Sequence, residues 1–400
     1  EPAPGPRRDP GLRAAALRTV LRIPSVIASA LAAAEHSLLA RSALVLVHEG
    51  DAASVAHESR QASALCVAAR GTSLGEGPAR AWYRHRYSVS YRQAPVFRSG
   101  AFSDTLEVAA PWSRLEGVYE GVRRALGEHV LVMAHLSHAY PDGASIYFTF
   151  AGIEHGGESS LAVYDRAVSV ALRATLDAGA TLSHHHGVGR SKAPRVGEEL
   201  GAAVAVVRAL KTAWDPDGIL NPGALIPPLT AAERIQEPLA DRGPALDQPS
   251  CLTRLPGSLS LAAAQAWLAP RGHTLSLTPA VLAELASVSV SDWIGMGLPG
   301  LPDRYEDPVF SPLAGFEAEL RSGFRFQLRP TPRRAVGPDL SALVRGMGGA
   351  LGRVHSAPLV AVPSDAPPAP VLPYSGERNP SIDPSEKAAL VRLTHELASL

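Results

Sequence analysis

Residues 183–189 of this chain read SHHHGVG, and no other stretch limits its possible folds and functions as strongly. Gly179 is typical of the residue that follows the end of a helix, so we expect the histidines on a short extended segment. Imidazole is the only side chain whose ordinary pKa lies near neutrality, so a histidine cluster can hold, accept or donate protons. Because glycine has no Cβ, Gly187 and Gly189 let the backbone pass close to a ligand.

A purification tag, a metal site and a solvated loop are the alternative interpretations of this histidine run. A tag is terminal and longer, whereas this run lies inside the chain. Adjacent residues on an extended strand point to opposite faces, so three consecutive histidines rarely converge on one ion, and we expect no metal site. From the residues alone, a catalytic or substrate-binding role and a solvated loop both stay open.

A second candidate residue, Tyr147, lies upstream in the sequence SIYFTF. Alternation along a strand places Ile146, Phe148 and Phe150 on one face and Tyr147 on the other. The apolar face is expected to pack under helices, which leaves the tyrosine on the open side of the sheet. Taken alone, this pattern fits an ordinary tyrosine on a half-buried strand, and the histidines are what favour a role in a site.

Helical and extended patterns alternate along the chain. Helices are expected over 11–35 with a break at Pro24, and over 57–70, 112–126, 159–177 and 196–213. Strands are expected over 42–47, 100–109, 130–136, 145–150, 274–277, 324–328 and 358–362, with a turn at 141–143. Antiparallel-looking strand pairs among helices indicate an α+β fold, in which helices cover an antiparallel sheet.

Composition narrows the classes of function. Hydrophobic residues make up 46% of the 400 residues, which is enough for the cores of two or three domains. The formal net charge is zero, which argues against nucleic acid and allows at most peripheral contact with a membrane. Cys66 and Cys251 do not form a disulfide framework, which favours a reducing, cytoplasmic location. Because the chain starts at Glu1 without an initiator methionine or a signal-peptide pattern, we expect it to be cut from a longer protein.

The motifs together carry a resemblance to a known family. SHHHGVG, the spacing from Tyr147 to His184, and DPDGILNPG at 215–223 resemble the C-terminal half of the alkyldihydroxyacetonephosphate synthases. These enzymes belong to the vanillyl-alcohol-oxidase-type, or PCMH-type, FAD-linked oxidases. The DPDGILNPG ending is shared with the D-2-hydroxyacid dehydrogenases of that superfamily, whereas the triple histidine is more specific. The resemblance covers roughly residues 8–227.

The resemblance implies FAD as the cofactor and ether lipid synthesis as the activity. In that family a fatty alcohol replaces the acyl chain of acyl-dihydroxyacetone phosphate, and the flavin ends unchanged in redox state. Removal of a proton next to a carbonyl needs a base in a dry, preorganised site, and neighbouring imidazoles can stabilise a phenolate. The matching positions are Tyr147, His184, His185 and His186 for proton transfer, and Asn221, Gly187 and Gly189 beside the flavin.

The expected substrate-binding residues, Tyr91, Arg92 and Gln93, depart from the family pattern. The family has an arginine, thought to hold the substrate phosphate, two residues after the tyrosine that corresponds to Tyr91. An ungapped match puts Gln93 at that place and Arg92 one position earlier. On an extended segment a shift by one residue turns the side chain to the opposite face, so Arg92 would lose a bidentate phosphate contact. The phosphate substrate is therefore open.

Composition and the resemblance also give the domain boundaries. Residues 1–227 resemble the cap, or substrate, domain, 228–245 are a linker, 246–366 resemble part of the PCMH-type FAD-binding domain, and 367–400 hold a Pro-rich linker and a terminal helix. The first half of the flavin domain is missing, and with it the glycine-rich loop that cradles the FAD pyrophosphate. The loop at 288–295 also lacks the usual paired glycines, so we expect a degenerate region that binds no flavin by itself.

The order of these domains is unusual, because the family places its flavin domain before the cap. Residues 9–17 and 383–390 start similarly, which fits either two capped helices or one period of a tandem array.

Three functions follow as hypotheses. The first is an FAD-dependent transferase that resembles alkyldihydroxyacetonephosphate synthase, with FAD held largely by sequence outside this chain. The second is an FAD-dependent oxidase or dehydrogenase of a 2-hydroxyacid or another alcohol. The third is a flavin-free, non-catalytic paralogue that serves as a scaffold or binding module. For either enzyme we expect a small-molecule or lipid-like substrate. The oligomeric state is open, with a homodimer as the hypothesis.

Overall fold

The computed structural model describes residues 10–35, 44–88, 93–226, 242–301, 312–366 and 384–400. It divides into two compact units. The first holds the described residues up to Ser103 with His129–Leu131 and Ala151–Tyr164, and the second holds Asp104–Glu128, Val132–Phe150 and the described residues from Asp165 on. The domain boundaries expected from the sequence stay predictions.

The first unit consists mainly of helices: α1 (Pro10–Leu21), α2 (Pro24–Glu35), α3 (Ala52–Ala68), α4 (Gly77–His85) and α5 (Ala94–Arg98). The break at Pro24 and the helix predicted over 57–70 are confirmed. Its small core joins Leu21 to Ala101 and Ile153. The strand predicted over 42–47 is wrong for its described part, because residues 44–47 have no regular structure and stay exposed.

A three-stranded sheet carries the site-bearing strands. Its strands are β1 (Phe102–Pro111), β2 (Leu131–Tyr140) and β3 (Gly143–Gly152), in the order β1-β3-β2. The predicted parity of β3 is confirmed, because Ile146, Phe148 and Phe150 are buried while Tyr147 is half-buried. A glycine is needed at 143, where a Cβ would lie 2.2 Å from the carbonyl oxygen of Ala110.

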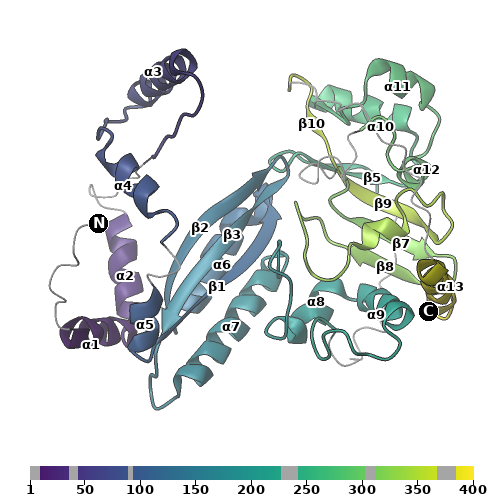
Figure 1. Ribbon diagram of the computed structural model, residues 1–400. Coiled ribbons are helices and arrows are strands. Elements are labelled where there is room, and N and C mark those ends of the chain that lie inside the picture. Colours follow the sequence, from purple (N-terminus) through teal and green to yellow (C-terminus); the bar gives the residue numbers. More distant parts are fainter. Residues whose placement is uncertain (1–9, 36–43, 89–92, 227–241, 302–311, 367–383) are drawn as a thin grey trace. The chain divides into compact units, whose positions relative to one another are not determined.

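Helices α6 (Trp112–Gly127) and α7 (Ser160–Asp177) run along this sheet, as predicted (Figure 1). The buried residues of α6 recur every three or four positions, which is the spacing of one helix face: Leu115, Val118, Val122 and Leu126. Leu115 of this face and Ile146 of β3 line the same cavity, so α6 lies on the apolar side of the sheet. The opposite side stays open for the polar residues described below.

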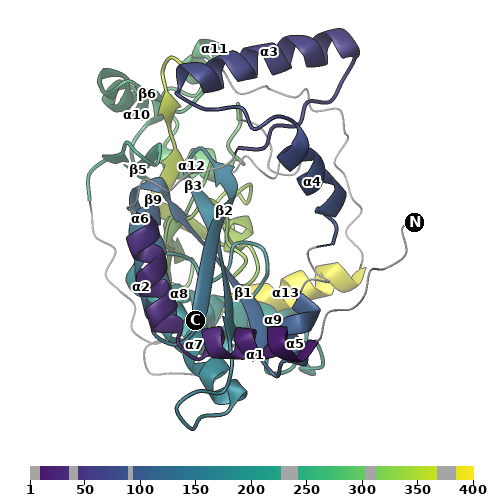
Figure 2. The same ribbon diagram turned by 90° about the vertical axis from the view of Figure 1, so that its left-hand side faces the viewer.

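The helix predicted over 196–213 is interrupted. The structure has α8 (Val196–Leu200) and α9 (Ala203–Trp214), separated at Gly201 with φ 51° and ψ −131°. Only glycine adopts that backbone conformation readily, so the chain turns there. The terminal helix α13 (Pro384–Ala398) lies against α9 in both views (Figures 1 and 2), and the Arg392 Nε donates to the carbonyl oxygen of Ala213 at 2.7 Å.

The second region of unit two is built on a five-stranded antiparallel sheet. Its strand order is β4 (Ala245–Asp247), β5 (Leu252–Pro256), β9 (Gly352–Val360), β7 (Phe316–Leu320) and β8 (Arg325–Leu328). Three helices accompany it: α10 (Leu261–Leu268), α11 (Pro279–Glu284) and α12 (Val290–Gly295). The strand predicted over 324–328 is confirmed, and the one predicted over 358–362 is the end of the longer β9.

The strand predicted over 274–277 is reduced to β6 (His273–Thr274), which pairs with β10 (Val362–Pro363). It ends because Ser276 has φ 62°, which is not an extended conformation. Both regions combine helices with antiparallel sheets, which confirms the α+β class. Among the described residues, no helix is long and apolar enough to cross a bilayer.

Candidate active site

The histidine turn is held by buried carboxylates rather than by a neighbouring strand. After a single bridge, in which the Thr181 N–H donates to Ala109 O at 2.9 Å, the segment leaves the sheet. Glu107 of β1 then takes over as acceptor: its Oε2 accepts the backbone N–H groups of His185 at 2.9 Å and His186 at 3.1 Å. Because this carboxylate is fully buried, its two hydrogen bonds hold the backbone of His185 and His186 in place.

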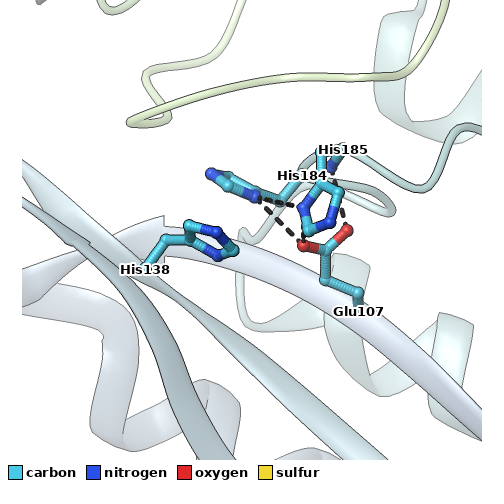
Figure 3. Close-up of side chains that lie close together, drawn as sticks. All are labelled: Glu107, His138, His184 and His185. Carbon is cyan, nitrogen blue, oxygen red and sulfur yellow. Dashed lines mark hydrogen bonds and ion pairs between the residues drawn. The ribbon is translucent and has the colours of Figure 1, made fainter. Parts of the chain in front are cut away.

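The other oxygen of Glu107 organises two imidazole rings (Figure 3). His184 Nδ1 lies 3.0 Å from Oε1, and His185 Nδ1 contacts the same oxygen. His184 Nε2 lies 2.9 Å from the Tyr140 hydroxyl, and His185 Nε2 lies 3.0 Å from the Tyr147 hydroxyl. One buried carboxylate thus starts two hydrogen-bonded chains, and each of them ends on a tyrosine.

The charge of Glu107 fixes the direction of these hydrogen bonds. Burial by itself raises the pKa of the Glu107 carboxyl, but the hydrogen bonds from His184 and from the backbone of His185 and His186 outweigh it and hold that pKa far below its ordinary value. An ionised carboxylate only accepts, so each Nδ1 donates to it. Nε2 of His185 is then the acceptor for the hydroxyl of Tyr147.

Burial, and then the negative charge of Glu107, raise the pKa of Tyr147. Tyr147 is therefore a neutral phenol at rest, and it becomes a base only by passing its proton to His185. The imidazolium formed in that step is stabilised by Glu107, as in other carboxylate–histidine pairs. The geometry supports a proton relay in which Tyr147 passes its proton to His185 and the carboxylate of Glu107 stabilises the protonated ring.

Three further histidines surround the relay. The His135 ring stacks on Tyr147 with a centroid distance of 4.8 Å, and His186 meets Tyr147 edge-on at 5.2 Å. His138 lies 5.1 Å from the rings of both His184 and His185. Burial lowers the pKa of His138 and of His186, so both are neutral near pH 7. His138 and His186 therefore add polar groups around the relay without adding positive charge near pH 7.

Lys192 lies beneath the histidine turn. Its side chain is buried and its Nζ donates to the carbonyl oxygen of Glu107 at 3.4 Å. Burial lowers the pKa of this lysine to about 8. It brings a positive charge close to a buried carboxylate.

The structure brings together the predicted proton-transfer residues Tyr147, His184, His185 and His186. Gly187 and Gly189 have φ of 76° and 57°, but a Cβ at either position would meet nothing within 4 Å. They are needed for the backbone turn, not for a close approach of the chain to other described atoms.

Asn221 lies in the turn after α9, with φ 46°. Asp215 closes this turn by accepting the N–H groups of Ile219 and Leu220, both at 3.0 Å. Leu225 N donates to Gly189 O at 3.1 Å, which ties the Asn221 turn to the glycine turn that follows the histidines. The place of Asn221 beside a flavin stays a prediction.

Tyr91, Arg92 and Gln93 are the substrate-binding residues predicted from the sequence. Tyr91 and Arg92 lie outside the described residues. Gln93 is the N-cap of α5 in the first unit, with φ −76° and ψ −20°, so the extended geometry expected there is wrong for Gln93. A helix start repeats its directions every three to four residues, so the argument from opposite faces does not apply to Gln93.

Four residues in and around the relay could also bind a metal ion. Glu107, His138, His184 and His185 offer one ligand atom each within 4.8 Å of one another, so these four groups could hold a cation. We expected no convergence because adjacent histidines on a strand diverge. The structure differs because the segment has left the sheet and both rings turn toward Glu107.

The second region provides a test of fit for the pyrophosphate of FAD. In its glycine-rich turn, the N–H groups of Gly346 and Gly348 donate to the carbonyl oxygens of Ile294 and Gly295, at 3.1 and 2.9 Å. Trp293 in the adjoining α12 is fully buried. These N–H groups are consumed within the protein, so this turn does not fit a phosphate cradle.

On its open side, this helix-covered antiparallel sheet carries a buried carboxylate, histidines and tyrosines, which are side chains able to accept and donate protons. The model of the family described as FAD linked oxidases, C-terminal domain, matches residues 7–225, just over half of the chain. The chain therefore belongs to this family. FAD is the cofactor of the family, and its members are enzymes.

Individual relatives share only 20–31% of their aligned residues with this chain. An alkyldihydroxyacetonephosphate synthase of Dictyostelium discoideum is 28% identical over 162 residues, which cover 38% of this chain and 26% of the relative. Glycolate oxidase subunit GlcD of Escherichia coli is 31% identical over 120 residues, 30% of this chain and 23% of the relative. A solved alkyldihydroxyacetonephosphate synthase overlaps 42% of this chain and 29% of its own, with a TM-score of 0.28 and 20% identity. The chain spans about a quarter to a third of the curated relatives it matches first.

Sequence reasoning missed Glu107, Tyr140 and Lys192. The only local signal for Glu107 was an acid next to apolar residues on a predicted strand, since ionised side chains are rarely buried without partners. Lys192 follows the glycine turn in a polar stretch and gave no signal. Their roles come from donors and acceptors that lie far away in the sequence.

Proposed function

We propose that this chain carries the proton-transferring substrate domain of a flavin-dependent enzyme that resembles alkyldihydroxyacetonephosphate synthase. The observation that supports this most is the relay in which Tyr147 contacts His185 Nε2 at 3.0 Å while His185 Nδ1 contacts buried Glu107. The triple histidine and the similarity to synthases of three organisms favour acyl-to-alkyl exchange over other reactions of the family.

In this proposal the relay removes and returns a proton next to the substrate carbonyl. His185 takes the phenol proton of Tyr147, and the resulting phenolate accepts the proton of the substrate carbon. His186, which is neutral near pH 7, donates a hydrogen bond to the carboxylate that leaves with the acyl chain. Bound FAD would supply an electrophilic centre for this reaction, while the residues of this chain would move the protons. The glycine-rich turn at 346–349 is not proposed as the site of the FAD pyrophosphate, because the N–H groups of Gly346 and Gly348 already donate within the protein.

The test uses the full-length protein with FAD, an acyl-dihydroxyacetone phosphate and a long-chain alcohol. Ether product is expected, and Tyr147→Phe should lower its rate about 100-fold or more, within the range of general acid–base catalysis. Tyr87→Phe is the matched control, because Tyr87 is 81% exposed in the first unit. An unchanged rate in Tyr147→Phe would refute the relay.

Oxidation of a 2-hydroxyacid is the second candidate. It is favoured by the similarity to glycolate oxidase subunit GlcD and by Gln93, which replaces the arginine expected to bind phosphate. The same relay suits this reaction, because His185 and Tyr147 can take the hydroxyl proton. Reduction of an artificial electron acceptor by glycolate or D-lactate, without ether formation, would identify it.

A flavin-free scaffold is the third candidate. The visible absorbance spectrum of the full-length protein after gel filtration with FAD distinguishes it, because a retained flavin band excludes it. The cytoplasmic location, the homodimer and a lipid-like substrate stay proposals. Gel filtration with light scattering tests the homodimer.

A further inference from the structure

The base of the histidine turn, residues 181–183, is held by a second buried carboxylate. Glu199 of α8 has a fully buried side chain. Its Oε2 accepts the backbone N–H of Leu182 at 2.7 Å, and its Oε1 accepts the hydroxyl of Thr181 at 2.7 Å. Glu199 thus does for the start of the segment what Glu107 does for its end.

The positive partner of Glu199 comes from the second region. The Arg334 guanidinium contacts Glu199 Oε1, and its other terminal nitrogen donates to the carbonyl oxygen of Arg329. Its side chain is 12% exposed, so this pair is largely shielded from water. A buried carboxylate without such a partner is costly, because its charge loses hydration without compensation.

The backbone next to Arg334 also contacts the turn. Ala335 N donates to the carbonyl oxygen of Ser183 at 2.9 Å. Val336 is buried, and a Cβ on Gly337 would lie 3.6 Å from Val207 of α9. Residues 329–337, which we call the brace, therefore contact the histidine segment through a charged pair and a backbone hydrogen bond, and pack against α9.

We propose that the brace positions the proton relay, and that Arg334 is a positioning residue that acts on His184 and His185 through Glu199. This inference rests on the proposed function for its catalytic meaning, but its geometry does not need the flavin. It gives the second region a role other than binding a cofactor. Without Arg334, Glu199 takes up a proton or moves toward water, and Leu182 and Ser183 lose the contacts that set where the next two rings begin.

The test measures the rings directly in the whole chain, without flavin or substrate. Nuclear magnetic resonance of protein labelled with ¹⁵N-histidine reports which ring nitrogen carries the proton, and His184→Gln and His185→Gln assign the signals. In the unmodified chain both rings should carry the proton on Nδ1. In Arg334→Gln that preference should give way to a mixture of tautomers, with the overall helix content unchanged by circular dichroism.

Arg353→Gln is the matched control. Arg353 also pairs with a carboxylate, Glu319, at 3.4 Å, but its side chain is 69% exposed and it lies on β9. Its removal should leave the histidine spectrum unchanged. A folded Arg334→Gln with an unchanged spectrum would overturn the proposal.

A double variant keeps the proposal testable if Arg334→Gln does not fold. Arg334→Gln with Glu199→Gln removes both charges and leaves two amides that can hydrogen-bond, and the glutamine oxygen still accepts the N–H of Leu182. This variant should fold and recover most of the original tautomer pattern. A double variant that stays as perturbed as Arg334→Gln, or fails to fold, would show that Arg334 does not act through Glu199.

Activity separates this inference from the proposed function. If the full-length protein forms ether, Arg334→Gln should lower kcat on the order of 100-fold with little change in KM, since misplacing a catalytic group by about 1 Å costs that much. If the protein forms no ether but the histidine spectrum responds as described, the proposed function fails and the brace stands.

Discussion

Replacement of Glu107 by glutamine should disturb both the stability of this protein and the order of its histidine protons. Glutamine keeps one acceptor oxygen, which can still take the N–H groups of His185 and His186. Its NH₂ group then faces His184 Nδ1 and His185 Nδ1. Because the NH₂ group and both Nδ1–H groups are donors, none of the three has an acceptor there. Both rings must change tautomer, and His185 can no longer accept the hydroxyl proton of Tyr147.

The magnitude follows from the contacts that are lost. Two hydrogen bonds from imidazole to an ionised carboxylate are removed, and each is worth about 1.5–3 kcal/mol. The two bonds together are worth about 3–6 kcal/mol. Breaking a buried charged pair costs about 3–5 kcal/mol, so we expect the free energy of unfolding to fall by about 3–5 kcal/mol. At about 2 °C per kcal/mol for a unit of this size, the melting temperature should fall by about 6–10 °C at pH 7.

The dependence on pH provides the sharper assay. The folded state holds the pKa of Glu107 below its unfolded value, so this carboxylate stabilises the protein above about pH 4.5 and loses that effect as the pH falls. Thermal unfolding between pH 3.5 and 7 should therefore show the gap between the unmodified chain and Glu107→Gln narrowing on the acid side. Glu116→Gln, an exposed change on α6, is the control and should leave the curve unchanged. A gap that is absent, or constant over this range, would refute the reasoning.

Three other substitutions test separate features of the same region. Burial lowers the pKa of Lys192 to about 8, so the unmodified chain should gain stability as the pH rises from 8 toward 10, and Lys192→Met should lack that gain in thermal melts. Burial raises the pKa of Asp142 to about 6, so the free energy of unfolding should fall as the pH rises from 4 to 6. Asp142→Asn should remove that fall. Gly143→Ala should cost about 3 kcal/mol in urea unfolding, because its Cβ would lie 2.2 Å from Ala110 O. Gly117→Ala in α6, where nothing lies within 4 Å, should cost nothing, and equal effects of the two alanines would contradict the steric argument.

Local patterns were sufficient where a side chain's environment depends on its own neighbours in sequence. The period of β3 identified the face with Phe148, and the helical pattern over 112–126 identified α6. They were insufficient where one backbone angle decides the outcome. The predicted helix over 196–213 is broken at Gly201, where φ is positive. The sequence does not show whether an isolated glycine in a helical pattern will adopt a positive φ.

The apolar stretch 42–47 illustrates a different limit. Its composition is that of a strand, but a strand needs a partner, and residues 44–47 pair with none of the described residues. Only the assembled chain determines whether an edge is near enough to pair.

The sequence by itself determined which side chains could transfer protons, because Tyr147 and the three histidines are chemically able to do so wherever they lie. Tertiary structure decided how they do it. Glu107 contacts rings that are 77 and 78 residues away, and Arg334 neutralises a carboxylate 135 residues away. The protonation of a buried group depends on the donors and charges packed around it, and a linear pattern does not contain those neighbours.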